Sequence, residues 1–320
     1  MKQKQPRELL SAERKRAGLS YDGILSSVFA IVLGLIVGLI ILFLCNPAQA
    51  LPGFATILTG AFTHGAKGIG QVFYYATPII LTGLSVGFAF KTGLFNIGTP
   101  GQFIMGGFGA VYVGILWTSL GPAHWFVALL ASVVMGAVWG LVPGLLKAYY
   151  NVNEVIASIM MNYIGMYLVN WIVKSSKPLF NNLRNESRNV AATANIPKMG
   201  LDKIFPGSSV NGGIIIAIIV VILIYLLLNK TTFGYELKAV GFNRDASKYA
   251  GINEKKSIIM SMMIAGAIAG LAGGLLYLAG TGKHIEIKDV LASEGFTGIS
   301  VALLGLSNPI GVLFLSLIHI

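Results

Sequence analysis

Charged residues and cysteine are scarce in this chain of 320 residues. Asp, Glu, Lys and Arg together make up 11% of it, less than half of the ~25% that is usual in soluble domains. Hydrophobic residues make up 55%, and the mean hydropathy is +0.76. Because a soluble fold of this length cannot hide so much apolar surface, the composition argues against a soluble enzyme, a nucleic-acid-binding protein and a disordered chain. The single cysteine, Cys45, excludes an internal disulfide and a thiolate metal site.

Two sequence patterns typical of catalysis occur in the wrong context. Gly83-Leu84-Ser85-Val86-Gly87 has the spacing of a nucleophile elbow, but it lies inside an apolar run and lacks the strand–turn–helix context of that motif. The segment Gly280–Lys283 lacks the Gly at 277 and the Ser or Thr at 284 that a phosphate-binding loop would carry. The chain is therefore predicted not to be an enzyme and to bind no ATP or other cofactor itself.

Metal ligands and intramembrane charges are equally sparse. No metal site is predicted, because the histidines are far apart in the sequence and have no carboxylates at metal-binding spacing: His64, His124, His284 and His319. No pair of carboxylates lies within an apolar run. Since a proton-driven transporter usually keeps an ionisable group inside the membrane, this absence favours an external source of energy.

Long apolar runs are what the chain has in abundance. A membrane-spanning helix needs about 20 mostly apolar residues, and the runs that reach this length are Ile24–Cys45, Val72–Phe90, Gln102–Leu120, Trp125–Leu146, Glu154–Val173, Gly212–Leu228 and Ile258–Ala279. A further apolar region, Phe296–Ile320, is interrupted by Asn308-Pro309. The first run is too long for the apolar core of a signal peptide, which has about 7–15 residues. We therefore predict an all-α, polytopic helical membrane protein with a basic tail, residues 1–23, and a transmembrane domain, residues 24–320.

Glycines recur at helical spacing within these runs. The chain has 40 glycines, and small residues four positions apart let helices approach closely in lipid. We expect close helix packing rather than a ligand site at three such sets: Gly34/Gly38, Gly136/Gly140/Gly144 and Gly266/Gly270/Gly274.

The distribution of positive charge predicts the orientation. Six of the 23 Lys and Arg precede the first apolar run, and another six lie within residues 230–257. Because cytoplasmic segments are enriched in Lys and Arg, we place the N-terminus and the 230–257 loop in the cytoplasm and residues 174–211 outside it. This outer segment is rich in Pro, Asn and Ser. It is either a passive connector, which we favour, or a surface that meets a substrate-delivery protein.

Polar and helix-breaking residues join the second and third runs, from Thr92 to Gln102. A broken helix is tolerated at membrane depth only against protein or a water-filled cavity, and transporters often place substrate sites at such breaks. A cytoplasmic turn just below the bilayer is an equally good interpretation. Asn96 and Gln102 are the candidates here for the translocation path.

Two asparagines mark the fifth run. Asn153 is a candidate N-cap, and Glu154 in the first turn suits the helix dipole. Asn162 is an amide well inside the span, so it either bonds another helix, which is slightly favoured, or faces the translocation path.

The polar loop from Thr231 to Lys256 carries a short helix signal. Asn243 and Asp245 can cap a helix start, and Gly251 can end a helix of about two turns. A short cytoplasmic helix with a small-residue face is suited to docking in a groove of a partner protein. A solvated charged loop is the alternative interpretation.

Three blocks of sequence together resemble ABC importer permeases of the ribose/branched-chain amino acid family. Residues 234–252 resemble the cytoplasmic coupling segment of that family, residues 93–102 its G-L-F-N-I-G-x-x-G-Q signature, and residues 295–311 its third shared block. Within the family, residues 153–163 and the outer loop most resemble nucleoside permeases of the guanosine type. The resemblance covers roughly residues 70–314. The sequence departs from the family pattern at Lys238, Ser247 and Thr99-Pro100. These departures weaken the assignment of a substrate more than the assignment to the family.

The resemblance implies a permease subunit in a bacterial cytoplasmic membrane, with two ATPase subunits, a second permease subunit and a lipoprotein that delivers substrate. ATP and Mg²⁺ would bind to the ATPase, and nucleosides are the expected cargo. The alternatives are a sugar or branched-chain amino acid permease, or an ion-coupled secondary transporter. The candidates for the translocation path remain Asn96, Gln102 and Asn162. The residues expected to couple to the ATPase are Glu236, Gly241, Asn243, Arg244, Asp245, Ala246, Tyr249, Ala250 and Gly251.

The last six residues, 315–320, depart from the family pattern. Their sequence, LSLIHI, is what a common sequencing adapter would encode if translated. We expect these residues to be an artefact of assembly and the true C-terminus to be missing. Long-read resequencing of the locus tests this expectation, and a stop codon directly after Ile320 would refute it.

Overall fold

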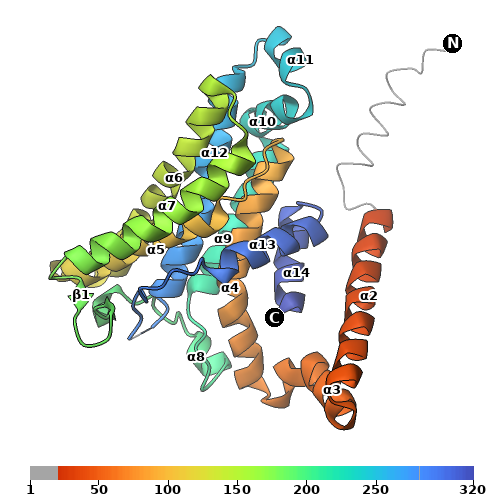
Figure 1. The fold of residues 1–320 in the computed structure, drawn as a ribbon, viewed down its shortest axis with the longest axis vertical. Coiled ribbons are helices and arrows are strands. Elements are labelled where there is room, and N and C mark those ends of the chain that lie inside the picture. Colours follow the sequence, from red (N-terminus) through yellow and green to blue (C-terminus); the bar gives the residue numbers. More distant parts are fainter. Residues whose placement is uncertain (1–20, 281) are drawn as a thin grey trace. The chain divides into compact units, whose positions relative to one another are not determined.

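The computed structural model describes residues 21–280 and 282–320, nearly all of whose regular structure is helical (Figure 1). It divides into two compact units, one up to Gly65 and the other from Ala66 to Ile320. The first unit contains α2 (Tyr21–Cys45) and α3 (Pro47–Thr63). The predicted basic tail, up to residue 20, lies outside the described residues.

The second unit is built on long helices joined by short ones. The long helices are α4 (Ala66–Lys91), α5 (Thr99–Leu116), α6 (His124–Tyr150), α7 (Glu154–Ser175), α9 (Gly213–Lys230) and α12 (Glu254–Tyr277). The shorter elements are η1 (Thr118–Ala123), β1 (Phe180–Asn181), β2 (Glu186–Ser187), η2 (Ala192–Ala194), α8 (Leu201–Ile204), α10 (Thr232–Phe242), α11 (Arg244–Tyr249), α13 (Ser293–Leu304) and α14 (Pro309–His319).

Six helices of the described chain are long and apolar enough to cross a membrane, which confirms the predicted fold class. They are α2, α4, α6 together with η1, α7, α9 and α12. The predicted run at Gln102–Leu120 is α5, which is not among the six. At 18 residues it is about 27 Å long, and nearly all of it is buried among other helices.

Two helices begin a few residues before the apolar runs that predicted them. Helix α4 begins at Ala66 rather than Val72, and α12 begins at Glu254 rather than Ile258. In α12, Asn253 caps the helix by accepting the backbone N–H of Lys256 at 3.0 Å. Hydropathy marks the apolar part of a helix, whereas capping groups decide where the helix begins.

Glycines bring the helices of the second unit together. A Cβ atom placed at Gly266 would meet the backbone of Gly136 and Gly140, and one at Gly270 would meet Gly136. Close packing at the two sets predicted on α6 and α12 is thereby confirmed. Gly34 and Gly38 on α2 have nothing within 4 Å of such an atom, so packing within their own unit does not explain that pair.

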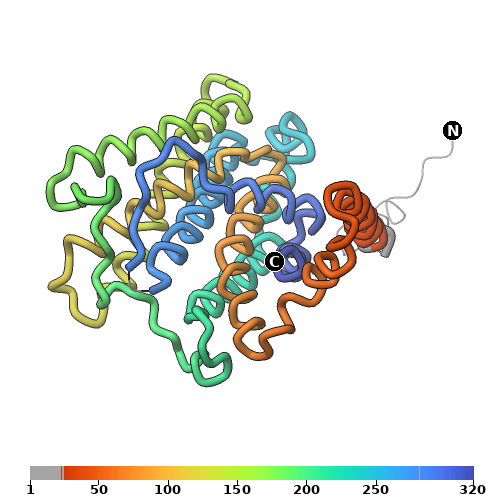
Figure 2. Tube along the Cα trace, turned by 60° about the horizontal axis from the view of Figure 1, so that its bottom comes forward, coloured from red at the N-terminus to blue at the C-terminus, as the bar shows by residue number. Residues whose placement is uncertain are grey.

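The segment 174–211 is tied to the chain that follows α12. The backbone N–H groups of Ser187, Val190 and Ile196 donate to the carbonyls of Ile285, Lys283 and Leu278 at 2.9, 3.0 and 2.9 Å. Figure 2 shows the two segments running along the same end of the second unit. Helices α10 and α11 lie at the opposite end of α12 (Figure 1), a helix of 24 residues and hence about 36 Å in length.

Candidate translocation and coupling sites

The chain between α4 and α5 leaves the helical path at residues 92–98, which we call the break. Gly93 has a φ of +76°, in the left-handed region that favours glycine. The Thr92 hydroxyl donates to the carbonyl of Ala89 at 2.8 Å and also contacts the hydroxyl of Ser261 on α12. The break is therefore an ordered, mostly buried feature held by its neighbours.

Three amide side chains meet at the break, and we call Asn96, Gln102 and Asn162 the amide cluster. Each is at most 1% exposed. The Asn96 Nδ2 donates to Gln102 Oε1 at 2.9 Å, and Gln102 Nε2 returns a bond to Asn96 Oδ1 at 3.3 Å. Asn96 Oδ1 also accepts the backbone N–H of Gly98 at 3.0 Å. These two amides thus link the break to the first turns of α5.

Asn162 on α7 makes hydrogen bonds both to the break and to the first turn of α5. Its Oδ1 accepts the backbone N–H of Gly101 at 2.9 Å, and its Nδ2 donates to the carbonyl of Ile97 at 3.0 Å. The N–H groups of a first helical turn have no partner within their helix, so Asn162 caps α5 from a different helix. A Cβ at Gly101 would lie 2.7 Å from the Cα of Asn162, which explains why glycine stands at this position.

The structure thus brings together the three residues predicted for the translocation path. Their amide groups are engaged within the chain and closed off from solvent. This geometry agrees with the helix-bonding interpretation of Asn162. A role in the translocation path stays a prediction for all three residues.

The polar loop after α9 folds into two short helices, α10 and α11. Asn243 lies between them, and its Oδ1 accepts the backbone N–H of Ala246 at 3.0 Å, as its N-cap prediction requires. Gly251 has a φ of +81° and its N–H donates to the carbonyl of Lys248 at 3.0 Å. Helix α10 was not predicted; Thr231 starts it by accepting the N–H of Gly234 at 3.0 Å.

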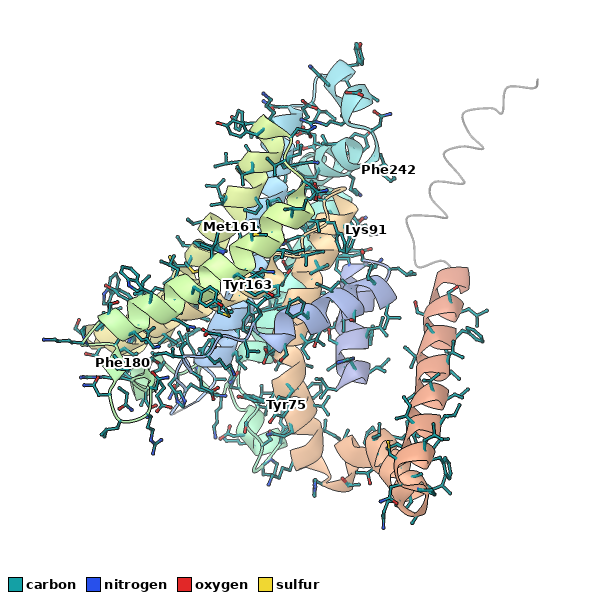
Figure 3. The ribbon with its side chains drawn as sticks, in the orientation of Figure 1. Tyr75, Lys91, Met161, Tyr163, Phe180 and Phe242 are labelled. Carbon is teal, nitrogen blue, oxygen red and sulfur yellow. The ribbon has the colours of Figure 1, made fainter. Side chains whose placement is uncertain are left out.

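The surface of α10 and α11 exposes aromatic side chains. Tyr249 is 94% exposed and Phe242 is 89% exposed, and Ala246 and Ala250 are exposed beside them in the sequence. We call these four residues the aromatic knob. Phe242, which Figure 3 labels, was missing from the predicted set. A large aromatic residue directly before an N-cap in a polar loop is the signal that could have identified it.

The charged candidates fall into two groups. Glu236 and Asp245 are exposed. Arg244 instead turns back to its own chain, where its Nε and Nη2 donate to the two carboxylate oxygens of Glu254 at 2.6 and 3.3 Å. Such a two-point bond fixes α11 against the start of α12, so Arg244 positions the knob rather than extending from it. On α10, burial lowers the pKa of Lys238.

Helix α10 contacts the break directly. Gly241, near the end of α10, lies against Thr92 and Gly93: a Cβ at Gly241 would be 2.6 Å from the Thr92 carbonyl carbon and 2.7 Å from the Gly93 nitrogen. A Cβ at Gly93 would in turn meet the backbone of Gly241. We call this contact of two backbones the glycine joint. Sequence spacing could not have found it, because nothing local relates the two residues.

Three features of the described chain are typical of a transport permease. They are the helices long and apolar enough to span a membrane, the break stabilised by buried amides, and the exposed knob at one end. No group of metal-binding side chains occurs in the part of the chain that the structure describes.

Comparison with known proteins identifies the family. Residues 68–319 match the family described as branched-chain amino acid transport system / permease component, and the chain belongs to it. It is 38% identical to the guanosine ABC transporter permease protein NupP of Bacillus subtilis, over 90% of this chain and 81% of that protein. It is 36% identical to the nucleoside ABC transporter permease protein NupB of Lactococcus lactis, over 92% and 81%. The glucose ABC transporter permease protein TsgB13 of Haloferax volcanii is 29% identical, over 81% and 68%. No solved structure matches the chain.

The chain is therefore a multi-pass membrane permease of an ABC importer and not an enzyme. Membership of this family rules out the alternative of an ion-coupled secondary transporter.

Proposed function

We propose that this permease imports nucleosides, and that ATP hydrolysis by a separate subunit drives it through α10 and α11. The similarity to the guanosine and nucleoside permeases supports the cargo. Glucose is the second candidate, because one of the relatives carries that name.

The aromatic knob supports the site of ATPase docking. Exposed apolar groups at the end of a polar segment mark a surface that another protein covers, and Tyr249 and Phe242 have almost no cover of their own. We assign the docking surface to the knob together with Glu236 and Asp245. Asn243, Gly251 and Arg244 shape α11 from within the chain. ATP and Mg²⁺ would be bound by the ATPase.

The glycine joint supports a route for the coupling. A displacement of α11 moves Gly241, which presses on the backbone at Gly93. The break then shifts against α5 and α7, where the amide cluster holds it. Because packed helices switch between discrete arrangements rather than deforming smoothly, this contact can bias the permease between inward and outward access.

The remaining partners complete the proposal. A second permease subunit forms the other half of the pathway, and a lipoprotein delivers substrate to the extracytoplasmic side. The 230–257 loop lies in the cytoplasm and residues 174–211 lie outside, as the distribution of Lys and Arg favours. The protein would reside in the cytoplasmic membrane of a bacterium.

Uptake by a host that lacks its own nucleoside permeases tests the cargo. The permease is expressed together with its ATPase, second permease and lipoprotein, and uptake of radiolabelled guanosine, glucose and leucine is compared. We expect ATP-dependent uptake of guanosine. Uptake of glucose or leucine without guanosine would contradict the proposal. An ATPase-dead complex is the control for passive entry.

A further inference from the structure

A cavity of about 550 Å³ lies at the end of α12 that is remote from the aromatic knob. Its walls come from α5, α7, the last turn of α12, the segment 282–292 and the first turn of α13. This volume falls in the range of small-molecule sites, roughly 300–1,000 Å³. No residue of the cavity was among the predicted site residues.

The cavity combines apolar walls with a few polar groups. Phe103, Met166 and Val169 form apolar wall, and Asn170 and Tyr277 add an amide and a phenol. One edge of the Tyr277 ring packs on Gly107, where a Cβ would lie 2.5 Å from the ring, and Tyr277 also lines the cavity. Asn170 uses its Nδ2 to hold the carbonyl of Lys288 at 3.1 Å. Its Oδ1 makes no hydrogen bond with the residues that the structure describes.

Most charges around the cavity are already paired. Lys288 Nζ bonds Glu286 at 2.9 Å, and this bond lowers the pKa of Glu286. His284 lies 3.0 Å from the carboxylate of Glu186. The walls therefore present no net excess of one charge, and they do not select a charged ligand.

Two charged groups are the exceptions. Lys283 also lines the cavity and has no ion-pair partner among the described residues, and its Nζ lies 5.6 Å from the centre of the Tyr74 ring. The other is the carboxylate of Glu294. It lies in the first turn of α13, where the helix dipole favours a negative charge. Among the described residues it pairs with no cation, and its side-chain contact is the hydroxyl of Ser293 at 3.2 Å. A carboxylate of this kind accepts two hydrogen bonds from a pair of adjacent hydroxyl groups, as acidic residues do with ribose in dinucleotide sites.

We propose that this cavity is a nucleoside-binding site of the permease, in which Tyr277 contacts the base and Glu294 accepts bonds from the ribose hydroxyls. The inference rests on the proposed function and adds the place where the cargo binds. The flat ring of a base gains from an aromatic wall. Lys283 and Glu294 offer opposite charges without ion-pair partners among the described residues, so charge alone does not separate a nucleoside from a zwitterionic amino acid, and the comparison with leucine below does. A free sugar would use Glu294 and leave the aromatic wall uncovered.

Protection of an introduced cysteine tests the site. Val290 lines the cavity and is 64% exposed, so Val290→Cys in a Cys45→Ser background gives this chain a single thiol, whose labelling is followed on this chain within the complete transporter. A membrane-impermeant maleimide is added to intact cells, with inosine, glucose or leucine in excess. We expect labelling from outside, slowed at least five-fold by inosine and unchanged by leucine or glucose.

Two variants in the same background separate ligand from structure. Glu294→Gln keeps the size of the side chain and removes its charge, and we expect it to abolish the protection by inosine. Asp202→Asn makes the same chemical change on α8, in an exposed side chain away from the cavity walls, and protection should remain. Equal labelling rates with and without inosine, or protection that survives Glu294→Gln, would overturn the proposal.

Inosine uptake by the same cells distinguishes the two failures. Uptake without protection overturns the cavity site and leaves nucleoside import standing. Protection without uptake supports the site and overturns the import function. Absence of both removes both proposals.

Discussion

The break and the aromatic knob place their polar and apolar groups in opposite ways. At the break, inside the helices, the conspicuous residues are amides, and each is buried and bonded within the chain. At the knob, on a polar loop, the conspicuous residues are aromatic, and they are almost fully exposed. The fold alone explains buried polar groups whose hydrogen-bond partners lie within the same chain. The fold does not explain the exposed aromatic groups of the knob, and in our proposal the ATPase covers them.

The largest effect is expected from placing a charge in the knob. Ala246→Arg adds a bulky cation to a surface where small and aromatic side chains lie exposed, and we expect it to abolish co-purification of the ATPase while membrane insertion continues. Leu183→Arg, at a site that is 95% exposed at the other end of the second unit, is the matched control. Unchanged co-purification of the ATPase with Ala246→Arg would show that the knob is not the docking surface. Figure 3 shows the two ends, marked by Phe242 and Phe180.

The glycine joint connects the two regions, and Gly93→Ala breaks it. The substitution strains a positive φ and drives a methyl group into the backbone of Gly241. We expect a loss of about 3 kcal/mol in stability, from the left-handed backbone and the overpacking together, and transport that falls more than ATPase binding. Thermal inactivation measures the loss of stability. Uptake of guanosine measures transport, and co-purification of the ATPase measures its binding.

Gly251→Ala is the control for strain alone. It has a φ of +81°, close to that of Gly93, but nothing lies within 4 Å of an added Cβ. We expect a loss of about 1 kcal/mol for the left-handed backbone. Equal losses at Gly93 and Gly251 would mean that the contact with Gly241 contributes nothing.

Local signals predicted the start and end of α11, missed α10, and predicted the break only in outline. The cap at Asn243 and the end at Gly251 depend on a few neighbouring residues, so the sequence contains their cause. The bond between Asn162 and Gly101 joins α7 to α5, and nothing in the sequence around either residue indicates that the other is its partner. The glycine joint and the cavity beside Glu294 are also products of tertiary packing, which a single sequence does not specify.

Asn162→Leu tests whether the buried amides hold the break. The variant keeps the side chain's size but leaves the N–H of Gly101 and the carbonyl of Ile97 without partners. An unsatisfied buried group costs about 1–3 kcal/mol, so we expect a loss of about 2 kcal/mol or more, seen as a lower temperature of thermal inactivation. A neutral result would show that the break does not depend on Asn162.

The smallest effect is expected one turn earlier on the same helix. Ser158 is fully buried beside Gly98, and its hydroxyl has no hydrogen-bond partner among the described residues. Because this hydroxyl makes no hydrogen bond with the described residues, removing it breaks none and leaves no other buried polar group without a partner. Ser158→Ala should therefore be neutral or slightly stabilising in the assay used for Asn162→Leu. A loss comparable to that of Asn162→Leu would mean that the Ser158 hydroxyl gains a partner in another state of the transporter, so that the contrast between a bonded and an unbonded group at the break holds for one conformation only.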